Sequence, residues 1–438
     1  MFRISTSLFF DQATQGIIDR QIDIARTQLQ LSSGKRVVKP SDDPAAAVSI
    51  LQLQASITAT EQFQDNSNVV ESRIQLATSV LGEVTNSLQR VRELAIEANN
   101  ASQSTQSLQS IRQEVQQQLN NLVDLSNTRD AKNEFLFAGT RTRNLPFVAN
   151  AAGTIGYTGN QQERFVQVSS LRTISTNIPG DAIFINVPEG NGTFRSNFGA
   201  ASPPLAAGVL ATFGGAVQNT GGAVIGPGSV TNPAALQTSQ FDYTIQFNVV
   251  QNPPGSGLLV STFDVRKFDK VTGAEDPGSP IVAAGVYDPS GTTISFDGLA
   301  VQIKGQPANG DAFSVTQSQT KSIFQTVQDL ASALQVKVLN PQTRADLNNR
   351  VGQALEDLNR DLDSVIDART VLGARLNAID DQRNIQSGLK LDLQERLSVV
   401  QDLDFASAIS EFRQEQTALT AAQQSFAQVA NLSLFNFL

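Results

Sequence analysis

The chain of 438 residues contains no His, no Cys, no Trp and a single Met, the first residue. These absences exclude thiol and imidazole nucleophiles, a His general base, zinc sites built on Cys or His, and disulfides. Metal or glycosidase chemistry that uses Asp and Glu remains open. The 32 basic and 41 acidic residues give a net charge of −9, so we expect neither nucleic acid nor an anionic membrane as a partner.

Residues 1–43 are expected to form a terminal arm that pairs with residues 399–438. Ile18, Ile22 and Leu29 share a stripe in a segment that is otherwise polar, so a helix here is of doubtful stability by itself. Residues 1–40 carry six basic and three acidic side chains (+3), whereas residues 399–438 carry four acidic and one basic (−3). Opposite charges favour pairing of the two ends, although the imbalance is small.

The N-terminal segment carries no recognisable export or membrane signal. The first 30 residues contain no apolar run of 7 to 15 residues after a basic start, so we expect no cleaved signal peptide. No stretch approaches 18 consecutive apolar residues, the length that indicates a membrane span. If the protein leaves the cell, we expect a route that does not read such a signal.

A short linker follows the first arm. Gly34 is expected to end the first helix and Pro40 to enforce an extended connection. Asp43 is expected to cap the next helix, with Pro44 at its first position. Asp42 and Asp43 could also be a catalytic or metal-binding pair, but the cap and the helix dipole already explain acidic residues at a helix start.

Long helices are predicted on both sides of the centre, from Pro44 to about Asn99, from about Thr105 to Ala131, and from Pro341 to about Val400. Apolar residues repeat there at steps of three and four, interrupted once at Arg369, which indicates helix seams. The seam residues are Ala77, Val80, Val84, Leu88, Val91, Ala95 and Ala98; then Leu355, Leu358, Leu362, Val365, Leu372, Leu376 and Ile379; and again Leu389, Leu393 and Leu397. We expect an α+β multidomain chain whose long antiparallel coiled-coil bundle comprises residues 44–178, with a β-hairpin, and residues 318–398.

The centre, residues 179–317, is expected to form an outer, mainly antiparallel β domain. Phe241, Tyr243, Ile245, Phe247 and Val249 alternate through five matches, and Ile183, Ile185 and Val187 alternate over a shorter stretch. The segment around Asn309 and Gly310 is expected to be the turn of a hairpin. Residues 199–235, rich in Gly, Ala and Pro, are expected to form a surface loop.

The C-terminal arm carries an aromatic stripe that is expected to be an assembly interface and not a ligand site. The residues expected in this interface, from both arms, are Phe2, Ile4, Ile18, Ile22, Leu29, Phe405, Phe412, Leu419, Phe426, Leu432, Leu434 and Phe435. We expect them to be buried by neighbouring subunits, so that arms too polar to fold alone become ordered on assembly.

Several motifs together resemble the hook-associated protein 3 family of the flagellin superfamily, whose members form the hook–filament junction. They are the start Phe2 to Ser7, the segment Ser33 to Ala46 with its two prolines, the stretch Phe135 to Gly139, the element Gly310 to Phe313 and the ending Leu432 to Asn436. The resemblance implies a structural protein without catalytic, cofactor-binding or metal-binding residues. It also implies type III export with a flagellar chaperone, an extracellular place in a homo-oligomeric ring, and hook-associated protein 1 and flagellin as neighbours.

Three other hypotheses for the function remain open. Flagellin is the nearest, but it usually lacks the prolines at positions 40 and 44 and closes with a Leu-Leu-Arg type of end. A surface adhesin on a coiled-coil stalk would explain the β centre and leave the two amphipathic ends unexplained. An enzyme would need a pair of carboxylates in a pocket, and no such constellation stands out.

Overall fold

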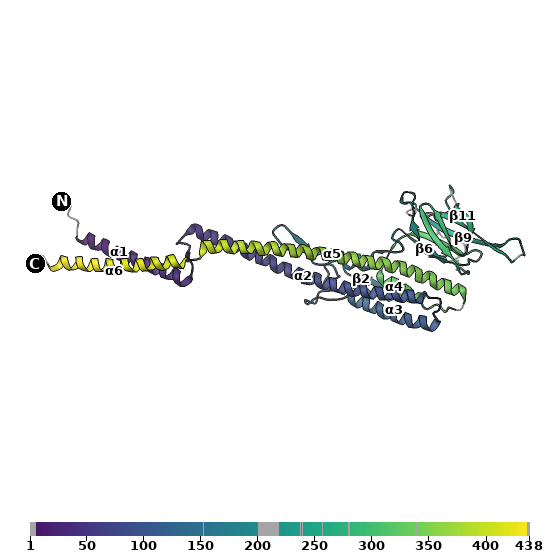
Figure 1. The fold of residues 1–438 in the computed structure, drawn as a ribbon, viewed down its shortest axis with the longest axis horizontal. Coiled ribbons are helices and arrows are strands. Elements are labelled where there is room, and N and C mark those ends of the chain that lie inside the picture. Colours follow the sequence, from purple (N-terminus) through teal and green to yellow (C-terminus); the bar gives the residue numbers. More distant parts are fainter. Residues whose placement is uncertain are drawn as a thin grey trace. The chain divides into compact units, whose positions relative to one another are not determined.

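The computed structural model describes residues 6–151, 153–199, 219–236, 238, 240–255, 257–278, 281–338 and 340–435. The α-helices are α1 (Thr6–Ser33), α2 (Pro44–Ala98), α3 (Thr105–Ser126), α4 (Ile323–Ala333), α5 (Pro341–Gln401) and α6 (Phe405–Phe435), with a π-helix η1 (Asp181–Ile185) and a 3-10 helix η2 (Pro233–Ala235) (Figure 1). Within the described residues, no helix combines the length and the hydropathy needed to cross a membrane.

The strands lie between α3 and α4 along the chain. They are β1 (Phe147–Ala149), β2 (Ile155–Tyr157), β3 (Phe165–Gln167), β4 (Thr173–Ser175), β5 (Val187–Pro188), β6 (Phe194–Phe198), β7 (Val224–Ile225), β8 (Ser229–Val230), β9 (Phe241–Gln251), β10 (Leu259–Asp269), β11 (Ile281–Tyr287), β12 (Thr292–Phe296), β13 (Leu299–Lys304), β14 (Ala312–Gln317) and β15 (Thr320–Lys321). The described pairings among β1, β2 and β5 to β15 are antiparallel, and β3 pairs with β4 in a separate two-stranded sheet. The predicted fold class, long helices from both end regions around a central antiparallel β part, is confirmed.

The chain divides into two compact units. Unit 1 comprises Met1–Asn68, Gln167–Arg172 and Ile379–Leu438, and unit 2 comprises Val69–Val166 and Thr173–Ala378. The beginning of α2 and the end of α5 therefore belong to unit 1, together with α1 and α6.

In unit 1, α1 and α6 lie side by side (Figure 1). The rings of Phe10 and Phe426 meet edge to face with centroids 5.6 Å apart, and the Thr27 hydroxyl donates to Glu415 at 3.0 Å. Farther along the unit, Lys390 of α5 pairs with Glu61 of α2 at 2.9 Å. The two end regions of the chain are thus partners in space.

In unit 2, the predicted helix seams form a packed core. Leu81 and Leu88 of α2, Leu122 of α3, and Leu358 and Val365 of α5 are fully buried. Each such side chain contributes about 1.5–3 kcal/mol relative to an exposed one. The burial explains why helices of this length are stable where their faces are covered.

An aromatic cluster joins this helical core to the chain segment that follows α3. The Phe147 ring lies 5.2 Å from Phe184 of η1 and 5.3 Å from Phe324 of α4, centroid to centroid. Phe137, from the Phe135 to Gly139 stretch, lies 5.3 Å from the Phe184 ring. Edge-to-face aromatic pairs of this kind add to the burial of their surface.

The β part contains two principal sheets that enclose one apolar core. The strand orders are β11-β10-β9-β14-β6 and β12-β13-β7, with β8 also paired to β13. Tyr243, Ile245 and Phe247 of β9 face this core, as their alternation predicts. The hydroxyl of Tyr243 donates to Asp297 at 2.9 Å, so its polar end is satisfied.

The predicted hairpin at Asn309 and Gly310 is wrong. Strand β13 pairs with β12, β7 and β8, whereas β14 pairs with β9 and β6. The turn exists, since the Asp311 N–H donates to the Ala308 carbonyl at 3.1 Å and Gly310 has φ +89°. It carries the chain from one sheet to the other, because alternation identifies a strand but not its neighbour.

Two further expectations differ from the structure. Ile183 and Ile185 lie in the π-helix η1, whereas Val187 lies in strand β5, because an alternation of only three residues does not fix the backbone conformation. The expected loop 199–235 contains β7, β8 and η2 in its described part, residues 199 and 219–235. Residues 200–218 lie outside the described residues.

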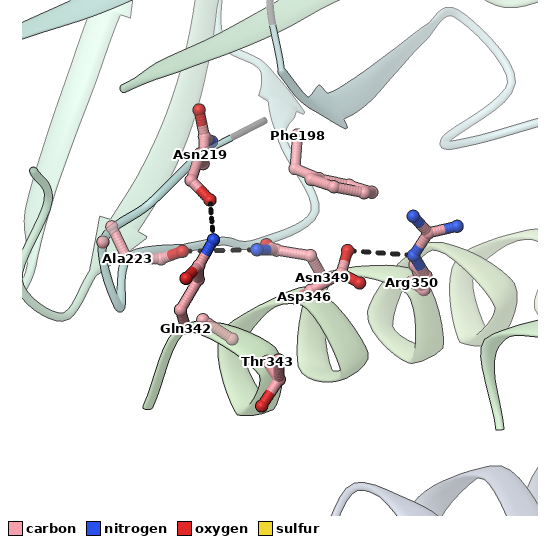
Figure 2. Close-up of a pocket in the computed structure, with 10 residues that line it drawn as sticks. Phe198, Asn219, Ala223, Gln342, Thr343, Asp346, Asn349 and Arg350 are labelled. Carbon is pink, nitrogen blue, oxygen red and sulfur yellow. Dashed lines mark hydrogen bonds and ion pairs between the residues drawn. The ribbon is translucent and has the colours of Figure 1, made fainter. Parts of the chain in front are cut away.

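The N-terminal part of α5 holds the β part through its amide side chains (Figure 2). The Asn349 amide accepts the Ile225 N–H at 3.0 Å and donates to the Ala223 carbonyl at 3.2 Å. These two hydrogen bonds resemble those that the backbone of a paired strand would make. Gln342 donates to the Asn219 carbonyl at 3.1 Å. The β part and α5 are therefore joined by hydrogen bonds that are buried at Asn349.

Candidate assembly surface and its linkers

Large apolar side chains are exposed on the α1/α6 pair of unit 1. Among the residues predicted for the interface, Ile18, Ile22 and Leu29 of α1 are 42, 59 and 43% exposed, and Phe405 of α6 is 51% exposed. Phe412, Leu419 and Phe426 of α6 are partly buried. A two-helix pair can cover only one side of each helix, so much of this apolar surface faces solvent in the single chain.

The side chains of five predicted interface residues lie outside the described part of the chain. Phe2 and Ile4 lie outside the described residues. Leu432, Leu434 and Phe435 lie in the last turns of α6, and their side chains are outside the described part.

The exposed apolar surface of unit 1 extends onto α2 and α5, where the sequence analysis did not predict it. Its members there are Val48 and Leu51 of α2, and Ile385, Leu389, Leu391 and Val399 of α5, with exposed fractions from 47 to 78%. Leu389 was predicted to lie in a helix seam, and it is 47% exposed instead. The heptad pattern identifies an apolar face but not whether this chain or another covers it.

The first linker begins where α1 ends. Gly34 has φ +70°, and its N–H donates to the Gln30 carbonyl at 2.8 Å, which closes the last turn of the helix. The predicted extended connection at Pro40 is a turn instead, because the Asp42 N–H donates to the Lys39 carbonyl at 2.9 Å. Proline favours the second position of such a turn through its fixed φ.

The two aspartates at the end of this linker act as backbone caps. The Asp43 carboxylate accepts the Ala46 N–H at 3.0 Å at the start of α2, with Pro44 as the first helical residue. The Asp42 carboxylate accepts the N–H of Lys39 at 2.8 Å. The hydrogen bond from Ala46 lowers the pKa of Asp43, and the one from Lys39 lowers the pKa of Asp42. Both stay ionised in a structural role.

The second linker, between α5 and α6, is a feature that the sequence analysis missed. Asp404 caps α6 by accepting the N–H groups of Ala406 at 3.0 Å and Ser407 at 3.3 Å. The hydrogen bond from Ser407 is the main cause that lowers the pKa of Asp404. An Asp one residue before a periodic apolar run was the available signal for this cap.

Within the described part of the chain, no group of three or more His, Cys, Asp or Glu side chains is arranged to hold a metal ion. The buried acidic residue Asp311 instead accepts the backbone N–H groups of Thr220, Gly221 and Ala308 at 2.8 to 3.0 Å. Its role is to order the segment before β7.

Comparisons with known proteins identify the class. Residues 4–142 match the family described as bacterial flagellin N-terminal helical region. The chain is also similar to the flagellins of Salmonella, for example with 32% identity over 143 residues, which are 32% of this chain and 29% of the flagellin of Salmonella rubislaw. The N-terminal third of the chain is therefore similar to the N-terminal helical region of flagellins.

Other relatives are more specific. Flagellar hook-associated protein 3 of Salmonella typhimurium is 32% identical over 196 residues, which are 44% of this chain and 61% of that protein. The protein of the same name from Escherichia coli is 29% identical over 212 residues, 47% of this chain and 66% of the relative. The matches thus span less than two thirds of these curated relatives.

Solved structures extend the likeness over a larger part of the chain. The flagellar hook-associated protein 3 of Legionella pneumophila has a TM-score of 0.69 and 28% identity, covering 80% of this chain and 98% of that structure. FlgL of Xanthomonas campestris has a TM-score of 0.65 and 27% identity, covering 80% and 99%. The predicted resemblance to the hook-associated protein 3 family is confirmed by these matches.

Proposed function

We propose that the protein is a structural component of the bacterial flagellum that joins the hook to the filament. The observation that carries this proposal is the likeness to the Legionella hook-associated protein 3, which extends over 98% of that structure. The flagellin matches rest on about a third of this chain, so they support the superfamily and not the particular member.

The exposed surface of unit 1 supports an assembling role. Apolar side chains such as Ile22, Leu51 and Val399 are more than half exposed in the single chain. Complete burial of an exposed apolar side chain contributes about 1.5–3 kcal/mol, so burying the exposed part of one of these side chains between subunits should stabilise the assembly by roughly 1–2 kcal/mol. The proposed partners are further copies of this chain in a ring, hook-associated protein 1 on one side and flagellin on the other.

The proposed place of action is outside the cell, reached by flagellar type III export with a chaperone and without a cleaved signal peptide. The carboxylates at the linkers are helix caps, so the proposed function involves no catalysis. We further propose residues 1–43 and 399–438 as terminal arms, residues 44–178 and 318–398 as the helical domain, and residues 179–317 as the outer domain.

The test is a chromosomal deletion complemented by the full chain. Without the protein, cells should build hooks and shed flagellin into the medium, and complementation should restore filaments. Sheared and purified flagella should contain few copies of the protein per filament. Thousands of copies would show that it is flagellin. Normal filaments without the protein would favour the adhesin reading, which glycan binding by the full chain would then support.

A further inference from the structure

The two linkers of unit 1 pair with each other through their backbones. Lys35 of the first linker forms an antiparallel bridge with Asp402 of the second. The bridge is closed by the Arg36 N–H, which donates to the Gln401 carbonyl at 2.8 Å, and by the Leu403 N–H, which donates to the Gly34 carbonyl at 3.0 Å. The exit of α1 and the entry of α6 are therefore held together at one point.

Arg36 contacts three helices at this point. Its guanidinium donates to the Val400 carbonyl of α5 at 2.9 Å and to the Asp43 carboxylate at the start of α2 at 3.3 Å. Its own carbonyl accepts the side-chain amide of Gln30 in α1 at 2.6 Å. The residues that flank Arg36 in the sequence do not predict that it contacts these three helices.

The chemistry of the site favours arginine. The carbonyls of the last turn of α5 have no partners within that helix and carry its partial negative charge, which a cation stabilises. The carboxylate of Asp43 supplies a second negative group close by. A planar guanidinium presents separate N–H groups to both acceptors, whereas a lysine ammonium is a single point charge.

A small apolar cluster lies beneath the polar contacts. Val37 of the linker is buried with Ala46 and Ile50 of α2, and Leu397 and Val400 of α5 pack against them. The linker is thus fixed from two sides, by the apolar cluster and by Arg36. The backbone bridge between the two linkers then couples α6 to the same point.

We propose that residues 34–37 and 400–404 form a clasp, with Arg36 as its positioning residue, which joins the two terminal helices to each other and restrains both against α2 and α5 of unit 1. The clasp is a property of the single chain. Its use in holding filament protein at the junction rests on the proposed function.

The clasp itself is tested on the purified full chain. Lys35 and Asp402 form a bridge of the kind without direct hydrogen bonds between the pair, for which the Cα atoms lie about 4.5 Å apart, within the range of a disulfide. The natural chain has no Cys, so the double variant K35C/D402C should form one intramolecular disulfide on mild oxidation. The matched control K39C/D402C places the first Cys outside the bridge and should remain reduced. Equal oxidation of both variants, or of neither, would overturn the clasp.

The role of Arg36 is tested by protease cleavage and hydrogen exchange at the linkers. R36Q should raise both rates by roughly three- to tenfold, because local opening becomes easier, while R36K should be intermediate. The control R20Q changes an exposed arginine of α1 and should leave both rates unchanged. Oxidised K35C/D402C should restore slow cleavage in R36Q. Unchanged cleavage in R36Q, or no restoration by the disulfide, would remove Arg36 from this role.

In cells, R36Q should shed flagellin into the medium, and the disulfide should reduce that loss. If the disulfide and cleavage results hold but the strain with R36Q keeps its filaments, the clasp stands and its use at the junction is overturned. If the deletion strain itself keeps normal filaments, the proposed function fails, whatever the clasp does.

Discussion

Glu356 of α5 provides a test of the buried electrostatics of unit 2. Its Oε1 atom is buried and has no hydrogen-bond partner within the described part of the chain. Burial, with a smaller contribution from neighbouring Asp357, raises the pKa of Glu356 from 4.5 to about 7, against the opposing influence of Arg195 and Arg360. The folded protein therefore binds a proton here that the unfolded chain releases.

The sign of the pH dependence follows from this difference. Below pH 4.5 the carboxyl is protonated in both states, and its contribution to stability is fully present. Between pH 4.5 and about 7 only the unfolded chain loses the proton, so stability falls as the pH rises. At 1.36 kcal/mol per pH unit the difference corresponds to roughly 3 kcal/mol, and because the carboxyl keeps some solvent contact we expect about 1–3 kcal/mol.

E356Q removes the charge with little change in shape. The variant should match the wild type at pH 4 and be more stable at pH 8, with unit 2 melting higher by roughly 2–4 °C per kcal/mol in calorimetry. E356M removes the same charge without a polar amide and should flatten the pH dependence equally. D367N, which changes an exposed acid of the same helix farther from Glu356, is the control and should leave the dependence unchanged.

A pH dependence of E356Q and E356M identical to that of the wild type would refute the reasoning. So would a loss of stability at pH 8 in both variants, because it would mean that the ionised carboxylate stabilises the fold.

Three other outcomes are expected. L419S/F426S should abolish incorporation into flagella while the calorimetric melting temperature of unit 2 stays nearly unchanged, because these side chains lie in unit 1. A large fall in the melting temperature of unit 2 would contradict an assembly role. N349A should leave the buried Ile225 N–H without its partner and lower the stability of the β part by about 1–3 kcal/mol in denaturant unfolding; no change would mean that this contact does not hold β7. Because the pKa of Asp43 is lowered, the stability of its cap is present above pH 3.8 and is lost as the pH falls through the folded pKa; D43N should therefore remove the acid-dependent rise in hydrogen exchange at Ala46, and a rise that persists would assign it to another group.

The sequence by itself determined where α1 ends and where α2 begins, at the first linker. Gly34 and the Asp43–Pro44 pair act on their own turn of backbone, so their effects can be read without knowing what lies nearby. The same holds for Asn340, whose side chain accepts the Thr343 N–H at 2.8 Å at the start of α5. The helix seams and the alternation in β9 were predictable for the same reason, because periodicity is a property of one segment.

Apart from the expected pairing of the two terminal arms, only the tertiary structure decided which segments meet. The turn at Asn309 and Gly310 connects two different sheets, and an apolar residue of the seam, Leu389, faces solvent. Arg36 and Asp402 lie far apart along the chain. The role of each depends on the backbone pairing between the two linkers that contain them. Neither periodicity nor capping carries information about a partner so distant in sequence, because such contacts arise only when packing brings the two ends of the chain together.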